Sequence, residues 1–189
     1  MDQDAGKVRL INIALSRIGE FSITALDEGT PQQQKAVTFF TNTRKALLRA
    51  HPWNFAVHEV ELARIPDETP YDFQYAFQLP ADFLRLLKVH DARNFKVQGR
   101  RVLSDEKVCR IKYVRDVEDP SQWDSTFTDA FTYQLAGDMT YGLVGQASMS
   151  ELMLSLASQK LKIAKHIDAT EDVQDAMDDS NSAVYAARF

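Results

Sequence analysis

Two acidic residues, Glu59 and Glu61, stand two positions apart where apolar and polar residues begin to alternate along the chain. Successive side chains of a β-strand point to opposite faces, so this spacing places both carboxylates on one face. In glycosidases such a pair supplies an acid and a base or nucleophile. Acidic residues are also common on exposed strands. A carbohydrate-active hydrolase therefore remains an alternative and not the main interpretation.

The other residue types that carry chemistry are scattered. The four histidines stand singly, whereas metal sites need clustered ligands. They are His51, His58, His90 and His166. Cys109 is the only cysteine, and we expect a buried, inert thiol because nothing near it in the sequence supplies an activating base. The P-loop, GxGxxG, GxSxG, HExxH and CxxC motifs are also absent, so the residues indicate no catalytic residue, no cofactor and no metal site.

Basic residues interleave with aromatic residues along the middle of the chain, a pattern that binds single-stranded nucleic acid in some proteins. They are Arg85, Lys88, Arg93, Lys96, Arg100, Arg101, Arg110 and Lys112. The more ordinary interpretation is strand alternation with one solvated face. The formal net charge of −5 also argues against an affinity that rests on a nonspecific grip on phosphates. A single-strand-binding module stays a second alternative.

The composition sets broad limits. A chain of 189 residues, 44% hydrophobic and 26% charged, suits one globular domain or two small ones. No apolar run approaches 18 residues, so we expect no membrane span. The first ten residues have two Asp among the first four and lack the basic-then-apolar pattern of a signal peptide. A single cysteine excludes an internal disulfide and indicates synthesis in a reducing cytoplasm.

Apolar periodicity predicts two helices in the first third of the chain. Residues 7–19 repeat apolar side chains every three to four positions and end at a glycine. A second helix should begin at Thr30, which forms a capping box with Gln33. Pro31 stands at the first helical position, where proline is favoured. It should end near residue 51, because Pro52 disfavours helix at the residue before it.

Beyond Pro52 the period changes to two, which indicates strands. Residues 73–79 alternate most strictly, and residues 108–114 alternate again. Segments 95–97 and 101–103 flank Gln98-Gly99-Arg100, which suits a hairpin turn. The connections are too short for crossover helices, so the roughly five strands should form a largely antiparallel sheet.

The last third should be helical again. A helix is expected from Asp119-Pro120, and the longest helix from the capping box at Ser148 and Glu151. The sequence thus predicts an α+β fold, in which a helical bundle of residues 1–53 and 119–189 carries an antiparallel β-sheet insertion of residues 54–118. The bundle would have two N-terminal and two C-terminal helices.

Short motifs, in this order along the chain, resemble the tail tubular protein A family of short-tailed bacteriophages. The triplet Ile18-Gly19-Glu20 closes the first helix, and the corner Trp53-Asn54-Phe55 follows the second. The segment Leu79-Pro80-x-Asp82 is similar to the family's entry into a later strand. The stretches 127–145 and 157–172 resemble the helices that follow its sheet.

The resemblance implies one adaptor domain over residues 1–189 that belongs to a head-to-tail adaptor. Such proteins are not enzymes. They form a ring, usually a dodecamer, beneath the portal protein in the virion, and the sequence leaves open whether the free protein is a monomer or already a ring. The ring extends the channel through which genomic DNA passes without sequence-specific binding. It offers a platform for the tail nozzle, which is tail tubular protein B-like, and for tail fibres. The implied location is the head–tail junction of the tail, after synthesis in the host cytoplasm and with no membrane involved.

A ring needs two different, complementary patches on each subunit. The charge separation along the last helix supplies our hypothesis for the subunit–subunit contacts. They are Lys160, Lys162, Lys165, Asp168, Glu171, Asp172 and Asp175. The end of the chain would order on docking and bind the portal. The portal-binding residues by this hypothesis are Asn181, Tyr185, Arg188 and Phe189.

Overall fold

The computed structural model describes residues 3–66, 71–90 and 94–186, and from residue 172 on it describes only the course of the backbone. The chain divides into two compact units. Residues 1–47 with 119–189 form the helical unit, and residues 48–118 form the sheet unit. The sequence-based boundary at residue 53 differs from the one at residue 47 by the last turn of a helix and the corner that follows it. The α+β class with an inserted antiparallel sheet region is confirmed.

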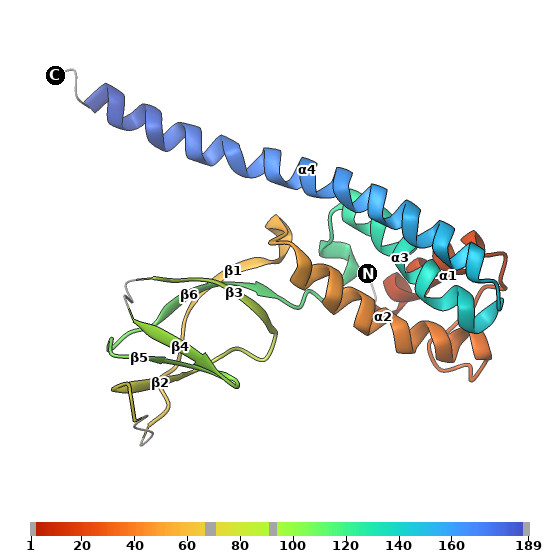
Figure 1. Ribbon diagram of the computed structural model, residues 1–189, viewed down its shortest axis with the longest axis horizontal. Coiled ribbons are helices and arrows are strands. Elements are labelled where there is room, and N and C mark those ends of the chain that lie inside the picture. The colour runs from red at the N-terminus through yellow and green to blue at the C-terminus, as the bar shows by residue number, and fades with distance from the viewer. Residues whose placement is uncertain (1–2, 67–70, 91–93, 187–189) are drawn as a thin grey trace. The chain divides into compact units, whose positions relative to one another are not determined.

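The helical unit is built from four helices and one short turn of 3₁₀ helix, which can be followed in Figure 1. They are α1 (Gln3–Arg17), α2 (Pro31–Ala50, whose last turn belongs to the sheet unit), η2 (Pro120–Gln122), α3 (Ser125–Leu143) and α4 (Ala147–Ala186). Helices α3 and α4 form a hairpin, and the side chain of Leu154 lies directly over Gly137. Within the described residues, no helix is both long enough and apolar enough to cross a membrane.

Local hydrogen bonds explain where α1 ends and α2 begins. Gly19 has φ +75°, and the amides of Gly19 and Glu20 donate back to Ser16 and Leu15, which is the Schellman ending of a helix. The hydroxyl of Thr30 accepts from the amide of Gln33 over 3.2 Å. The predicted cap is therefore confirmed. The Gln33 side chain reaches back one residue further than a capping box requires, to the amide of Gly29.

The start of α3 differs from expectation. Asp119-Pro120 opens only the 3₁₀ turn η2, and the helix begins at Ser125. Asp124 ends the intervening extended stretch because its carboxylate accepts from the amides of residues 126 and 127. Between the two caps Trp123 is buried, and its ring packs against three aromatic rings of the unit. These are Phe40, Phe127 and Phe131.

The sheet unit opens with the 3₁₀ turn η1 (Asn54–Ala56), and its described residues form six strands. They are β1 (Val57–Glu61), β2 (Tyr75–Gln78), β3 (Phe83–His90), β4 (Phe95–Gln98), β5 (Arg101–Ser104) and β6 (Arg110–Arg115). Every pairing is antiparallel, in the orders β1-β6-β3 and β2-β5-β4. The predicted hairpin is confirmed, with Gly99 at φ +60° in its turn.

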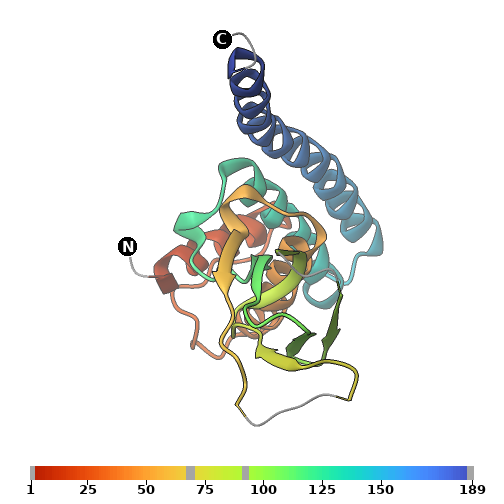
Figure 2. The same ribbon diagram turned by 90° about the vertical axis from the view of Figure 1, so that its left-hand side faces the viewer.

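One segment of the chain pairs with strands of both sheets. The chain beyond β1 pairs with β2, through a bridge between Arg64 and Phe77 and amide bonds from Ile65 to Ala76 and from Gln78 to Ala63. In Figure 2 this path can be followed from β1, in orange. The sheets share one apolar core. It contains Leu62, Phe77, Leu79, Val89, Val102, Cys109, Ile111 and Tyr113.

The alternation over residues 108–114 predicts that Cys109 lies within a strand. In the structure β6 begins at Arg110, so Cys109 lies just before the strand. Its carbonyl accepts from the amide of Leu62, and the side chain is fully buried. Burial raises the pKa of its thiol to about 11. The thiol is therefore protonated at neutral pH, as an inert structural cysteine would be.

Candidate assembly surfaces

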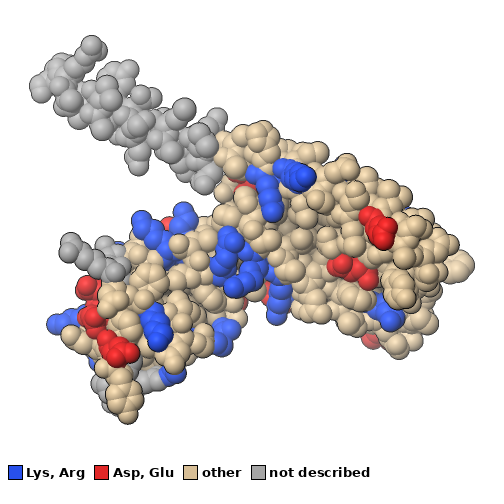
Figure 3. Space-filling view, in the orientation of Figure 1, with Lys and Arg blue, Asp and Glu red and all other residues tan. Residues whose placement is uncertain are grey.

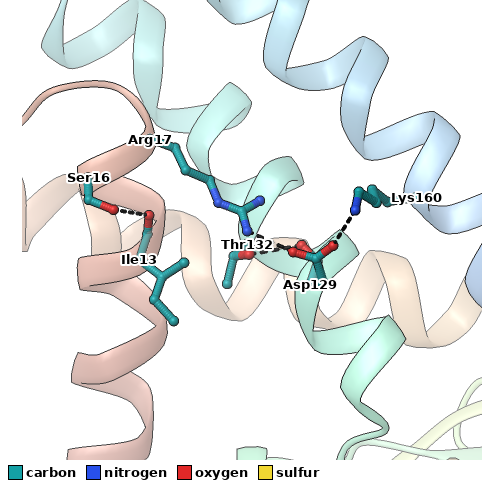
Figure 4. A network of polar contacts seen from close by, with 6 residues as sticks. All are labelled: Ile13, Ser16, Arg17, Asp129, Thr132 and Lys160. Carbon is teal, nitrogen blue, oxygen red and sulfur yellow. Dashed lines mark hydrogen bonds and ion pairs between the residues drawn. The ribbon is translucent and has the colours of Figure 1, made fainter.

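A polar network joins three helices of the helical unit at the carboxylate of Asp129, as Figure 4 shows. Arg17 of α1 donates from Nη2 to Oδ1 over 2.8 Å, and Nζ of Lys160 on α4 lies 2.9 Å from Oδ2. The guanidinium carbon of Arg17 lies 3.3 Å from the centre of the Tyr133 ring, a close cation–π contact. We call this group the Asp129 clamp.

The clamp keeps its charges at neutral pH. Burial alone would raise the pKa of Asp129, but hydrogen bonds from Arg17 and Lys160 outweigh burial and hold that pKa below its usual value. The same carboxylate raises the pKa of Lys160 through its hydrogen bond and its charge. Both groups therefore remain charged at neutral pH, and the charged contacts hold the three helices together.

The predicted subunit–subunit residues fall into different environments. Lys160 belongs to the Asp129 clamp within one subunit. Lys162 and Glu171 are exposed, Lys165 is half-buried, and Asp168 is buried. The side chains of Asp172 and Asp175 lie outside the described residues. The predicted portal-binding residues are not described at the level of side chains either. Asn181 and Tyr185 belong to the backbone of α4, and Arg188 and Phe189 lie outside the described residues.

The two units differ in net charge. Residues 48–118 contain twelve Lys and Arg against eleven Asp and Glu, so the sheet unit is nearly neutral. The remaining ten Lys and Arg face sixteen Asp and Glu, so the acidic excess of the chain belongs to the helical unit. A negative helical unit would repel DNA rather than hold it.

An exposed aromatic side chain stands on the segment between α1 and α2. Phe21 is 84% exposed, although residues of the same segment are fixed. The Asn12 amide bonds both to the carbonyl of Ile23, over 2.9 Å, and to its amide, over 2.8 Å. Glu28 accepts from Thr24 and from the amide of Ala25, which lowers the pKa of Glu28. We call residues 20–29 the anchored loop.

A groove of about 720 Å³ runs between α1 and the start of α3. Its walls are mainly apolar and include Leu10, Ile13 and Trp123. The lining also contains two cations, Arg9 and Arg17, and two carboxylates, Asp119 and Asp129. Among the residues that the structure describes, Nη1 of Arg17 is buried and has no hydrogen-bond partner. We call this feature the α1–α3 groove.

Strands β3 to β6 carry Lys and Arg but no acidic residue. The cations are Arg85, Lys88, Lys96, Arg101, Arg110, Lys112 and Arg115. Figure 3 shows Lys and Arg spread over the visible face of the sheet unit. Some cations of the unit are engaged within it, since Arg100 donates to the carbonyls of Pro80 and Ala81. The edge strand β4 is exposed along its length, including the apolar Phe95 and Val97.

Glu59 and Glu61 lie side by side on β1, as their spacing predicts, but each faces a cation across the ladder. Glu59 pairs in register with Lys112, 3.8 Å between charged atoms, and Glu61 with Arg110. His90 Nε2 lies 3.9 Å from Glu59. The arrangement forms a charged ladder on an exposed strand. Among the described residues, no group of three His, Cys, Asp or Glu side chains is placed to hold a metal ion.

Sequence reasoning missed the Asp129 clamp, the α1–α3 groove and the exposure of Phe21. The helix periodicity did not distinguish Arg17 and Lys160 from other surface cations. A sequence signal existed only for Phe21, which is an aromatic residue in a loop next to Glu20 and Ser22.

The described residues form a two-unit α+β protein. No protein-family model matches the sequence, and no curated protein matches it either.

Proposed function

We propose that this protein is a structural head-to-tail adaptor, similar to tail tubular protein A, that assembles as a ring beneath a phage portal. In the proposal the ring extends the DNA channel and carries the tail nozzle. The observation that supports it best is the ordered series of family-like motifs, because each of them has a definite structural task in this chain.

Two of the motifs turn the chain at helix ends. Gly19 in Ile18-Gly19-Glu20 takes the positive φ that ends α1. Trp53 is buried after α2, and its carbonyl accepts from the amides of Ala56 and Val57 at the start of the sheet unit. Position 19 therefore favours glycine because of its positive φ, and position 53 holds a large aromatic side chain that is buried.

The third motif fixes the entry to β3. The carboxylate of Asp82 accepts from the hydroxyl of Tyr113 over 3.1 Å, and its carbonyl accepts from the amide of Asp116 over 2.7 Å. Burial and the nearby Asp82 raise the pKa of Tyr113 to about 12, so the phenol stays a hydrogen-bond donor. Asp82 thus joins the start of β3 to the C-terminal half of β6 and to the residue that follows it.

The proposal is tested by measuring the mass of the purified protein alone and with a portal ring from the same phage. An adaptor joins the portal in fixed stoichiometry, and truncation before Asn181 should abolish this joining. The double change Glu59→Gln and Glu61→Gln serves as the matched control, because it should abolish any hydrolysis but leave assembly unaffected. A protein that ignores the portal in all forms would overturn the adaptor proposal.

A second candidate, binding of single-stranded nucleic acid, is favoured by one observation, namely that β3 to β6 carry cations and no carboxylate. The test is binding of an oligonucleotide at 50 and 200 mM salt. Lys88→Ala with Lys96→Ala should weaken binding and flatten its salt dependence. Binding that is absent at both salt concentrations would exclude this candidate.

A further inference from the structure

We propose that the free edge of strand β4 binds an extended segment of a partner protein, which joins the sheet as an added strand. In this segment apolar residues alternate with Asp or Glu. The inference goes beyond the proposed adaptor function and does not depend on it, because it rests only on described residues of the sheet unit.

The backbone of β5 alternates its hydrogen bonds between two neighbouring strands. In β2 the amide of Gln78 donates away from β5, to the carbonyl of Ala63. The preceding residue Phe77 therefore bonds to β5, at its register partner Val102. Since Val102 directs its backbone groups to β2, the next residue, Leu103, directs its own to β4.

Strand β4 consequently presents backbone groups at its outer edge. Leu103 lies opposite Lys96, whose amide and carbonyl bond within the hairpin. The amides and carbonyls of the alternate residues Phe95 and Val97 point the other way. Among the described strands, only β5 pairs with β4. Two donors and two acceptors thus stand at strand spacing, and the backbone of an extended peptide complements them.

The side chains of the same two residues add an apolar contact. Phe95 and Val97 lie opposite Ser104 and Val102, on the face that contributes Phe77 and Val102 to the core of the sheet unit. Because β4 is the last strand, these side chains stay 40% and 42% exposed. An added strand with apolar residues beside them would extend the core.

The other free edges are less suited to strand addition. Strand β3 pairs with β6 through two register shifts, and such irregularities bend an edge away from new partners. Strand β1 carries the exposed Glu59 and Glu61. By contrast, β4 has no register shift and no carboxylate.

The charges beside this edge indicate an acidic partner segment. Between the two apolar residues, the exposed Lys96 points to the opposite face of the sheet, where Arg101 of β5 also lies. Asp105 and Glu106 follow β5 near the Phe95 end of the edge. We therefore expect the carboxylate of the partner segment opposite Lys96.

Two other occupants fit less well. A second β4, in the register that pairs Phe95 with Val97 in both directions, would place Lys96 directly opposite Lys96, and like charges there are destabilising. The phosphates of a nucleic acid accept hydrogen bonds but donate none, so the carbonyls of Phe95 and Val97 would stay unpaired.

Two labelled peptides test the proposal on the full chain by fluorescence anisotropy. The first is acetyl-Val-Glu-Val-Glu-Val-amide, and the second has Lys in place of both Glu. The acidic peptide should bind at least about threefold more tightly, and Lys96→Glu should reverse this order. Lys88→Glu, at an exposed lysine of β3, is the matched control and should keep it. No saturable binding of the acidic peptide, or an unchanged order in Lys96→Glu, overturns the proposal.

A proline substitution tests the backbone contact. Val97→Pro removes an outward amide but no bond to β5, so the thermal unfolding of the chain should change little. The affinity for the acidic peptide should fall at least about tenfold. Val97→Thr keeps the amide and a β-branched side chain, and serves as the control. Wild-type affinity of Val97→Pro contradicts the proposal.

Amide hydrogen exchange of the wild type tests the same contact without a substitution. With saturating acidic peptide, the amides of Phe95 and Val97 should slow at least about tenfold more than the amide of Lys96, which is already bonded to β5. Equal slowing of the three amides, or none, overturns the proposal.

Discussion

Asp129 shows how one residue organises three helices. Its two carboxylate oxygens are divided between Arg17 and Lys160, which come from opposite ends of the sequence. Because the carboxylate remains partly accessible to water, each ion pair is weakened by solvent screening. The contribution of the clamp therefore depends on both pairs being present together with the stacking of Arg17 on Tyr133.

The stability contributed by Asp129 should depend on pH. Its pKa is lower in the folded protein than in the unfolded chain, so its contribution is complete above the unfolded value near 4 and is lost as the pH falls through the folded value. Asp129→Asn should be less stable than the wild type at pH 7, and the difference should shrink toward pH 3. Urea unfolding at a series of pH values measures this. A difference that is constant with pH would show that the charge is unimportant.

Asn12 should matter more than its half-buried position suggests. Asn12→Ala removes two hydrogen bonds to Ile23 and should cost about 1–3 kcal/mol of unfolding free energy, because buried backbone groups lose their partners. Ser16→Ala on the same helix is the control. The hydroxyl of the exposed Ser16 donates to the carbonyl of Ile13, and its removal should cost no more than about 0.5 kcal/mol. Equal effects of the two changes in chemical denaturation would contradict this assignment.

At the scale of the element, the α3–α4 hairpin depends on a close approach of the two helices. A methyl group added at Gly137 would lie 2.7 Å from Cδ2 of Leu154 and 3.2 Å from its backbone nitrogen. Gly137 is therefore needed as a contact surface, although alanine is the better helix former.

Two glycine substitutions on α3 should have opposite effects. Gly137→Ala should lower the free energy of unfolding by about 1–3 kcal/mol because it forces the helices apart. In Gly142→Ala the new methyl meets only the flexible end of Lys35, at 3.3 Å, so the change should be neutral or stabilise by up to about 1 kcal/mol. Thermal unfolding of both variants provides the comparison. A stabilising Gly137→Ala would mean that the helices are further apart than described.

At the scale of the whole molecule, the chain divides into two compact units. The core of the sheet unit lies entirely within residues 48–118, and β1 continues into the second sheet so that one core serves both. The chain enters and leaves this unit once, as an insertion between α2 and η2.

Residues 48–118 should therefore fold without the rest of the chain. We expect a cooperative, low-temperature thermal transition, because a domain of this size buries a small fraction of its surface. Circular dichroism during heating measures it. Ile111→Ala in the same fragment, which should cost about 2–5 kcal/mol, is the control and should abolish the transition. A fragment that shows no transition would mean that the units depend on each other.

The sequence by itself determined the features that depend on neighbours along the chain. Thr30 and Gln33 define the start of α2, Gly99 defines the hairpin turn, and the period of two indicates strands, because caps, turns and alternation are local. Local rules also misplaced the start of α3, since Asp119 and Asp124 both offer cap signals and only the burial of Trp123 between them favours the second.

Tertiary structure alone decided which surface residues meet. Arg17 and Asp129 are 112 positions apart, so no periodicity relates them, and Lys160 could not be recognised as part of a clamp rather than of an exposed strip. The α1–α3 groove and the exposure of Phe21 likewise depend on how helices pack. Contacts between distant segments depend on how the apolar faces of all the elements pack together. That packing is defined only when the whole chain has folded.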